Sequence, residues 1–153
     1  MLDLQAVKQN LYNYCLQLLE EKIEVLRSAL NAATEAANNE TKSTVGDKHE
    51  TSRAMMQLEQ EKLSKQLNQL LDQKRELQKL DIGPASNAVK KGSLVKTDKG
   101  YIFLSIALGK IIFEEETVFT VSSLSPIGMQ LLGLKVKDMA KLNDTVYRIE
   151  NIQ

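Results

Sequence analysis

Two acidic residues, Asp47 and Glu50, are the side chains in this sequence whose type and spacing best suit chemistry. They lie in the polar stretch "TKSTVGDKHETSR", residues 41–53, in which Val45 is the one sizeable apolar side chain. Mg²⁺ in proteins is usually bound by one or two carboxylates together with phosphate oxygens and water. Two carboxylates alone hold this ion poorly, so a metal role for this pair requires ligands from another molecule.

The same spacing also has a purely structural interpretation. An acid followed three residues later by glutamate resembles a capping box, with Asp47 as the N-cap and Glu50 as the third helical residue. Acidic side chains at the start of a helix are also stabilised by the helix dipole. The spacing by itself favours this interpretation, which is compatible with a functional role.

The other reactive residue types are sparse and indicate no self-contained enzyme. His49 is the only histidine and has no cysteine or second histidine near it, which argues against a zinc site. Cys15 is the only cysteine, so no intrachain disulfide can form, and its helical surroundings predict a packed thiol. No phosphate-binding loop, nucleophile elbow or catalytic Cys/His pair is present. We therefore expect an accessory factor that is not itself an enzyme.

Composition and charge narrow the class of partner. Lys+Arg and Asp+Glu each number 20, so the chain lacks the basic surplus that binding to nucleic-acid phosphates usually needs. The sequence shows no signal peptide and no apolar run of the about 18 residues typical of a membrane span. These features predict a cytoplasmic protein with no membrane partner.

The acidic stretch lies between two long segments with helical periodicity, about Leu4–Ala37 and Glu50–Leu80. The first 80 residues contain no proline, and their only glycine is Gly46. In the second segment, apolar residues recur every seven positions, as in the seam of a coiled coil: Met56, Leu63, Leu70 and Leu77. Gln60 and Lys74 interrupt this seam.

The simplest arrangement is an antiparallel coiled-coil hairpin over residues 1–80 with an acidic tip loop at about residues 38–50. The helices would be roughly 50 and 46 Å long, and the loop would lie about 45 Å from the rest of the protein. A dimer of straight coils is the alternative. Gly46 among polar residues favours the turn, and hence a monomer.

After residue 80 the pattern changes. Residues 81–93, "DIGPASNAVKKGS", predict a linker, so residues 94–153 are expected to form a separate domain. Residues 98–100 predict a hairpin turn, and residues 114–116, all glutamate, predict a solvated turn between strands. The predicted strands are Leu94–Lys96, Tyr101–Leu108, Thr117–Val121 and Thr145–Ile152.

One short helix is expected among these strands. Ser125 is a good N-cap, Pro126 suits the first helical turn, and Gly133 suits the C-terminal stop. The C-terminal part is therefore predicted to be a small α+β domain, with a twisted antiparallel sheet that holds one helix.

Two sequence blocks together resemble a known family. "GDKHE", Gly46–Glu50, fits a G-D-x-x-E pattern, and "FTVSSLSPIGMQLLGLKVKD", Phe119–Asp138, fits a strand followed by Ser-Pro, a leucine-rich turn and glycine. Both patterns are similar to those of the bacterial Gre transcript-cleavage factors, and the resemblance extends over the layout of the whole chain. It implies an N-terminal antiparallel coiled coil with an acidic tip, followed by an FKBP-like α+β domain.

The resemblance also implies a function, a partner and site residues. In the family, the coiled coil enters the secondary channel of RNA polymerase. The tip acids help to hold the second catalytic Mg²⁺, so that the polymerase's own site cleaves backtracked RNA. The tip acids fall on Asp47 and Glu50, and the polymerase-docking segment falls on Ser125 and Pro126. The Mg²⁺ would be shared with RNA polymerase, no cofactor would be bound independently, and DNA and RNA would be contacted only through the elongation complex.

Three alternatives stay open. After the tip pattern the chain has Thr51-Ser52-Arg53, where the family usually carries an acid. This departure favours a channel-binding regulator or inhibitor of RNA polymerase without cleavage activity. A second alternative is an FKBP-like prolyl isomerase or chaperone with a coiled-coil arm, although few aromatic side chains are present to line a proline pocket. The third is a coiled-coil scaffold whose tip is only a capped turn.

Overall fold

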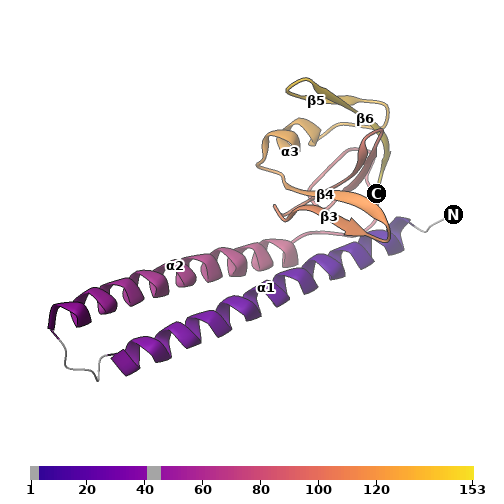
Figure 1. The fold of residues 1–153 in the computed structure, drawn as a ribbon. Coiled ribbons are helices and arrows are strands. Elements are labelled where there is room, and N and C mark those ends of the chain that lie inside the picture. Colours follow the sequence, from indigo (N-terminus) through magenta and orange to yellow (C-terminus); the bar gives the residue numbers. More distant parts are fainter. Residues whose placement is uncertain (1–3, 41–45) are drawn as a thin grey trace. The chain divides into compact units, whose positions relative to one another are not determined.

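The computed structural model describes residues 4–40 and 46–153 (Figure 1). Two long helices, α1 (Leu4–Glu40) and α2 (Gly46–Gln78), are followed by a sheet and one short helix, α3 (Pro126–Leu131). The predicted class, a long helical hairpin followed by a small α+β domain, is confirmed. The described strands are β1 (Leu94–Thr97), β2 (Gly100–Ser105), β3 (Gly109–Phe113), β4 (Glu116–Ser122), β5 (Met139–Leu142) and β6 (Thr145–Ile152).

Contacts divide the chain into two compact units. The hairpin unit comprises residues 17–74, which form most of α1 and α2. The sheet unit comprises residues 75–153 together with the start of α1, up to Leu16. The helical pattern runs through Leu16 without a break, so the periodicity does not mark this division.

The hairpin unit is held together by apolar side chains between α1 and α2, which run antiparallel (Figure 1). Leu19 and Ile23 of α1 and Leu63 of α2 are buried. Burial of one such side chain stabilises a fold by about 1.5–3 kcal/mol. Lys74 adds a salt bridge to Glu20 at 3.6 Å, and both side chains are partly exposed, so its contribution is small.

The apolar side chains between the two helices become smaller and less buried towards the turn. Ala33 and Ala37 are half-buried there in place of leucine, and Met56 is half-buried opposite. Gln60, which interrupts the leucine seam, donates from Nε2 to Thr34 Oγ1 at 3.3 Å. In the half of the hairpin near the turn, the two helices therefore bury less apolar surface against each other and are joined by a polar contact.

Both helices extend further towards the turn than the apolar pattern indicates. α1 ends at Glu40 instead of near Ala37, and α2 begins at Gly46 instead of near Glu50. The added residues are mostly polar and carry no apolar periodicity, yet a helix extends readily once it is nucleated. Residues 41–45 of the predicted tip loop lie outside the described residues.

The strands form one sheet in the order β3-β4-β2-β1-β6-β5. Neighbouring strands are antiparallel except β2 and β4, which pair in parallel with Tyr101 opposite Val118. The prediction of a purely antiparallel sheet is therefore wrong. β3 and β4 form a hairpin that joins the sheet through β4, so the chain between β2 and β4 makes the crossover that a parallel pair needs.

The two strands that the sequence analysis missed, β3 and β5, lie at the two edges of the sheet. Ile111 is the only buried residue of β3, and Ala140 is the only buried residue of β5. A strand with one buried side chain lacks the alternation of apolar and polar residues that identifies a half-buried strand.

One face of the sheet forms the main core with α3. Successive side chains of a strand point to opposite faces, so Ile102 and Leu104 of β2 share this face. They pack with Val95 of β1, Ile149 of β6 and Leu131 of α3, and all five are buried.

The start of α1 packs against the strands on the opposite face of the sheet. Phe103, between Ile102 and Leu104, is fully buried there, as are Leu11 and Cys15 of α1. Tyr14 contacts Phe113 of β3, with ring centroids 5.4 Å apart. The sheet is thus covered by α3 on one face and by the start of α1 on the other.

Polar contacts also tie the start of α1 to the segment that was predicted as a linker. Lys8 is fully buried, and its Nζ donates to the Gly83 carbonyl at 2.8 Å. Burial, followed by the nearby charge of Lys90, lowers the pKa of Lys8. Gln5 donates from Nε2 to the Ile82 carbonyl at 3.1 Å. These contacts, and the burial of Val89 in the α3 core, show that this segment packs into the sheet unit.

Candidate functional site

The predicted acidic pair lies in the first turns of α2. This helix begins at Gly46, so Asp47 is its second residue and Glu50 its fifth. An N-cap residue lies outside the helix it caps. The capping-box assignment, with Asp47 as the N-cap and Glu50 as the third helical residue, is therefore wrong by two positions.

The helical backbone places positions 47 and 50 next to each other on one face of α2, because residues three apart are neighbours on a helix surface. The Glu50 side chain is exposed, while the Asp47 side chain lies outside the described residues. Arg53, three residues further along the same face, is exposed. The face therefore presents acidic and basic positions in succession.

The described residues contain no group of three or more histidine, cysteine, aspartate or glutamate side chains placed to hold a metal ion. Carboxylate oxygens are the ligands that Mg²⁺ prefers, but this ion also needs water and other oxygens. The chemistry of Asp47 and Glu50 thus fits one part of a magnesium coordination shell, with the remaining ligands supplied from outside the chain.

The second predicted site, Ser125 and Pro126, forms the start of α3. Ser125 has an extended backbone (φ −69°, ψ 159°), and its Oγ accepts from the Gly128 N–H at 3.1 Å. The same hydroxyl donates to the Ser122 carbonyl at 2.6 Å. The predictions of an N-cap at Ser125 and of proline in the first turn are confirmed. Gly133, with φ 84°, provides the left-handed stop beyond the helix end, also as predicted.

Gly128 allows α3 to approach the end of β4 closely. A Cβ atom built on Gly128 would lie 2.1 Å from the Ser122 carbonyl oxygen, closer than any real contact. The sequence alone does not mark this residue, because a glycine inside a short helix carries no signal for a neighbour four or more residues away. The close approach is what places Ser125 and Pro126 beside the sheet.

Apolar side chains around α3 are unusually exposed, and sequence reasoning missed them as a group. Leu124 is 80% exposed and Met129 59% exposed, and Leu132 and Val136 are also exposed. Single exposed apolar residues are common, but several near one short element are typical of a contact surface. The leucine-rich block can be recognised in the sequence. The sequence does not indicate which of its apolar side chains are exposed to solvent.

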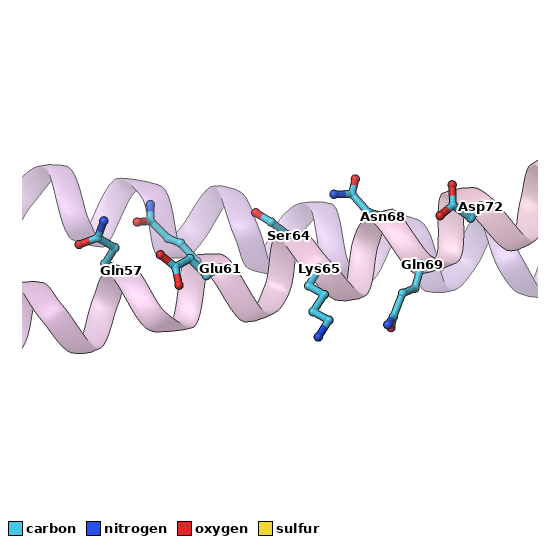
Figure 2. A pocket seen from close by; sticks show the side chains of 8 residues that line it. Gln57, Glu61, Ser64, Lys65, Asn68, Gln69 and Asp72 are labelled. Atoms are coloured by element: carbon cyan, nitrogen blue, oxygen red, sulfur yellow. The ribbon is translucent and has the colours of Figure 1, made fainter.

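An open groove runs along α2 (Figure 2). Its lining is polar, and Lys65 and Gln69 point to one side of the helix while Asn68 and Asp72 point to the other. Catalytic groups need to converge on a common point. The groove is therefore a solvated helix surface without the geometry of a catalytic site.

No described helix is both long enough and apolar enough to cross a membrane.

Neither a protein-family model nor a curated protein matches the chain. Two solved structures are similar to it. One is the crystal structure of GreA factor homolog 1 (Gfh1) of Thermus thermophilus, with 20% identity, a TM-score of 0.35, and coverage of 90% of this chain and 94% of that chain. The other is a structure of the transcription factor Gfh1, with 20% identity, a TM-score of 0.36, and coverage of 90% and 92%. Values this low carry no conclusion about what this chain does.

Proposed function

We propose that this chain is a transcription elongation factor that inserts its helical hairpin into the secondary channel of RNA polymerase and stimulates cleavage of backtracked RNA. The proposal combines the sequence resemblance of Gly46–Glu50 and Phe119–Asp138 to Gre factors with the helical hairpin and the capped α3. It assigns to Asp47 and Glu50 the metal-positioning role, and to Ser125 and Pro126 the docking role.

The observation that carries the proposal is the place of the acidic pair at the turn end of the hairpin unit. In this unit α1 runs from Gln17 to Glu40 and α2 from Gly46 to Lys74. At about 1.5 Å per residue these helices are roughly 36 and 43 Å long. A pair of carboxylates on the first turns of such a helix suits delivery into a narrow site on a large partner, since positioning raises the effective concentration of a catalytic group.

The acids need not form a complete metal site by themselves. A magnesium ion shared with the polymerase would polarise the phosphodiester and activate water, as in two-metal hydrolysis. Asp47 and Glu50 would contribute carboxylate oxygens and orient the water at the RNA 3′ end. Because α2 holds positions 47 and 50 on one face, both could act on the same ion.

Docking of the sheet unit is proposed for the surface around Ser125 and Pro126. The Ser125 cap fixes the start of α3, and exposed Leu124 and Met129 provide apolar area beside it. Apolar side chains at the centre of an interface usually contribute most of its affinity. This surface would hold the factor on the polymerase while the hairpin occupies the channel.

The test is an RNA-cleavage assay on stalled, backtracked elongation complexes, paired with a measurement of binding to core RNA polymerase. The Asp47→Asn variant is expected to lose cleavage and to bind polymerase nearly as well as the wild type. Glu59→Gln serves as the matched control, because Glu59 is an exposed acid on α2 nine residues beyond Glu50. Loss of cleavage in both variants would show that general charge, not the acidic pair, is responsible.

A second candidate function is a regulator or inhibitor that occupies the channel without promoting cleavage. Exposed Arg53 favours it, because a positive charge on the face of positions 47 and 50 opposes cation binding. In that case the wild type would bind polymerase and slow RNA synthesis without producing cleaved RNA. The Arg53→Glu variant would then be expected to gain cleavage activity.

A further inference from the structure

A cavity of about 90 Å³ lies inside the sheet unit, between the start of α1 and the sheet. Four of its lining side chains are aliphatic: Val7 and Leu11 of α1, Leu94 of β1 and Val118 of β4. It is smaller than the about 150 Å³ engineered cavity that accepts benzene. A short alkyl chain would therefore fill it.

Two aromatic rings complete the apolar lining. Tyr101 of β2 and Phe113 of β3 both border the cavity. The Phe113 ring is held by its contact with Tyr14 of α1. The faces of aromatic rings carry partial negative charge and attract cations within about 6 Å.

Two carboxylates border the same cavity on its solvent side. Glu114 lies in the turn between β3 and β4, Glu116 is the first residue of β4, and both line the cavity and are exposed. Neither carboxylate forms a salt bridge with a cationic side chain within the described part of the chain. An apolar cavity bordered by uncompensated negative charge attracts a cation that carries an apolar group.

The turn formed by Glu114 and Glu115, next to Glu116, has a backbone conformation that is energetically costly for residues other than glycine. Glu114 and Glu115 have φ angles of 50° and 67°, which a two-residue hairpin turn of this kind usually assigns to asparagine and glycine. Backbone strain of this type is often found at functional sites. The glutamates here occupy positions that other residue types would fill with less strain.

We propose that this cavity binds a small organic ammonium ion that carries a short apolar chain. The aliphatic side chains would hold the chain, and the rings of Tyr101 and Phe113 together with Glu114 and Glu116 would hold the ammonium group. An anion would be repelled by the two carboxylates, and a neutral molecule would gain nothing from them. The inference is independent of the proposed function, since the residues that line the cavity include neither the acidic pair nor Ser125 and Pro126.

The test is an NMR titration of the isotopically labelled full chain with propylammonium chloride, whose alkyl chain is smaller than benzene. Two molecules with a similar short chain serve as controls, neutral 1-propanol and anionic butanoate. We expect the amine to shift the signals of Leu94, Tyr101 and Val118, and to bind about fivefold more tightly than the alcohol. Equal affinity for amine and alcohol, or shifts confined to α2, would overturn the proposal.

Variants in the acidic turn separate the cavity from general surface charge. Glu114→Gln and Glu116→Gln are each expected to weaken amine binding about two- to fivefold. Glu115→Gln is the matched control, because Glu115 lies between them but does not line the cavity. An equal loss in all three variants would mean that the amine responds to diffuse charge, and the site would be rejected.

A cavity-filling change tests the location directly. Val7→Phe places a larger side chain in the cavity from α1 and is expected to abolish amine binding while the spectrum stays folded. Unchanged binding in a folded Val7→Phe protein would show that the amine binds elsewhere. Should this variant fail to fold, the glutamine variants decide the question alone.

Discussion

At the scale of single residues, Ser125 shows how one hydroxyl organises the start of α3. Its Oγ accepts from the Gly128 N–H and donates to the Ser122 carbonyl. Ser125→Ala is expected to lower the free energy of unfolding by about 1 kcal/mol, the usual cost of a lost N-cap. Urea unfolding measures this change. Ser125→Asn keeps an acceptor at the cap and should recover most of the loss, so an equal loss in both variants would contradict the capping role.

Burial of Cys15 makes the free energy of unfolding vary with pH in the alkaline range. Burial raises the pKa of its thiol from 9.0 to about 12. Between these values the unfolded chain loses the proton that the folded chain keeps, so the thiol's contribution is complete below pH 9.0 and declines as the pH rises towards 12.

Comparison of the wild type with Cys15→Ala isolates this contribution from other groups. The difference in unfolding free energy between the two proteins should be constant below pH 9.0, then change by up to about 1.4 kcal/mol per pH unit in favour of the variant. Chemical unfolding at several pH values measures it. Parallel curves on both sides of pH 9.0 would show that the thiol is not buried in its neutral form.

At the scale of elements, the hairpin unit depends on a seam that is apolar at one end and polar at the other. Leu19, Ile23 and Leu63 are buried, whereas Gln60 meets Thr34 through a hydrogen bond. A polar residue in such a seam lowers stability and helps to fix the register of the two helices. The turn half of the hairpin is therefore expected to open more readily than the half that contains Leu63.

Gln60→Leu is expected to restore the seam and to raise the free energy of unfolding by about 1 kcal/mol, since the position is half-buried. Gln57→Leu is the matched control, because Gln57 is exposed on the same helix and its replacement should leave stability nearly unchanged. Thermal unfolding followed by circular dichroism compares the two. A similar effect of both variants would indicate that helix propensity, not burial in the seam, is responsible.

At the scale of the whole molecule, the sheet unit needs residues from both ends of the chain. Leu11 and Cys15 of α1 are fully buried against it, and Gln153 donates from Nε2 to Gln5 Oε1 at 3.0 Å. The sheet domain expected from residues 94–153 alone lacks this covering helix. In such a fragment the face of the sheet that α1 covers would be exposed to solvent. Any activity assay, including a prolyl-isomerase assay, should therefore use the full chain.

Leu11→Ala is accordingly expected to destabilise the sheet unit by about 2–5 kcal/mol, the usual cost of truncating a buried leucine. Methyl NMR signals of Leu104 and Ile149 report unfolding of this unit during a urea titration. Val25→Ala, at a position of α1 that is 68% exposed, is the control and should change little. A folded fragment of residues 75–153 as stable as the full chain would contradict the role assigned to the start of α1.

Local sequence signals determined much of this protein. The absence of proline and the leucine spacing predicted α1 and α2, and Ser125, Pro126 and Gly133 marked the two ends of α3, because these signals act within one or two helical turns. Alternation of apolar and polar residues identified β6 in the same way. The sequence also singled out Asp47 and Glu50, and α2 places both positions on one face.

Only the tertiary structure decided how distant segments meet. The parallel pairing of β2 with β4, the edge positions of β3 and β5, and the packing of α1 on the sheet depend on contacts between residues far apart in the sequence. The same is true of the cavity, whose lining combines Val7 with Val118. Periodicity reports which side of an element is apolar, but not which other element covers it, because many pairings bury similar apolar area and the choice between them depends on the packing of the whole unit.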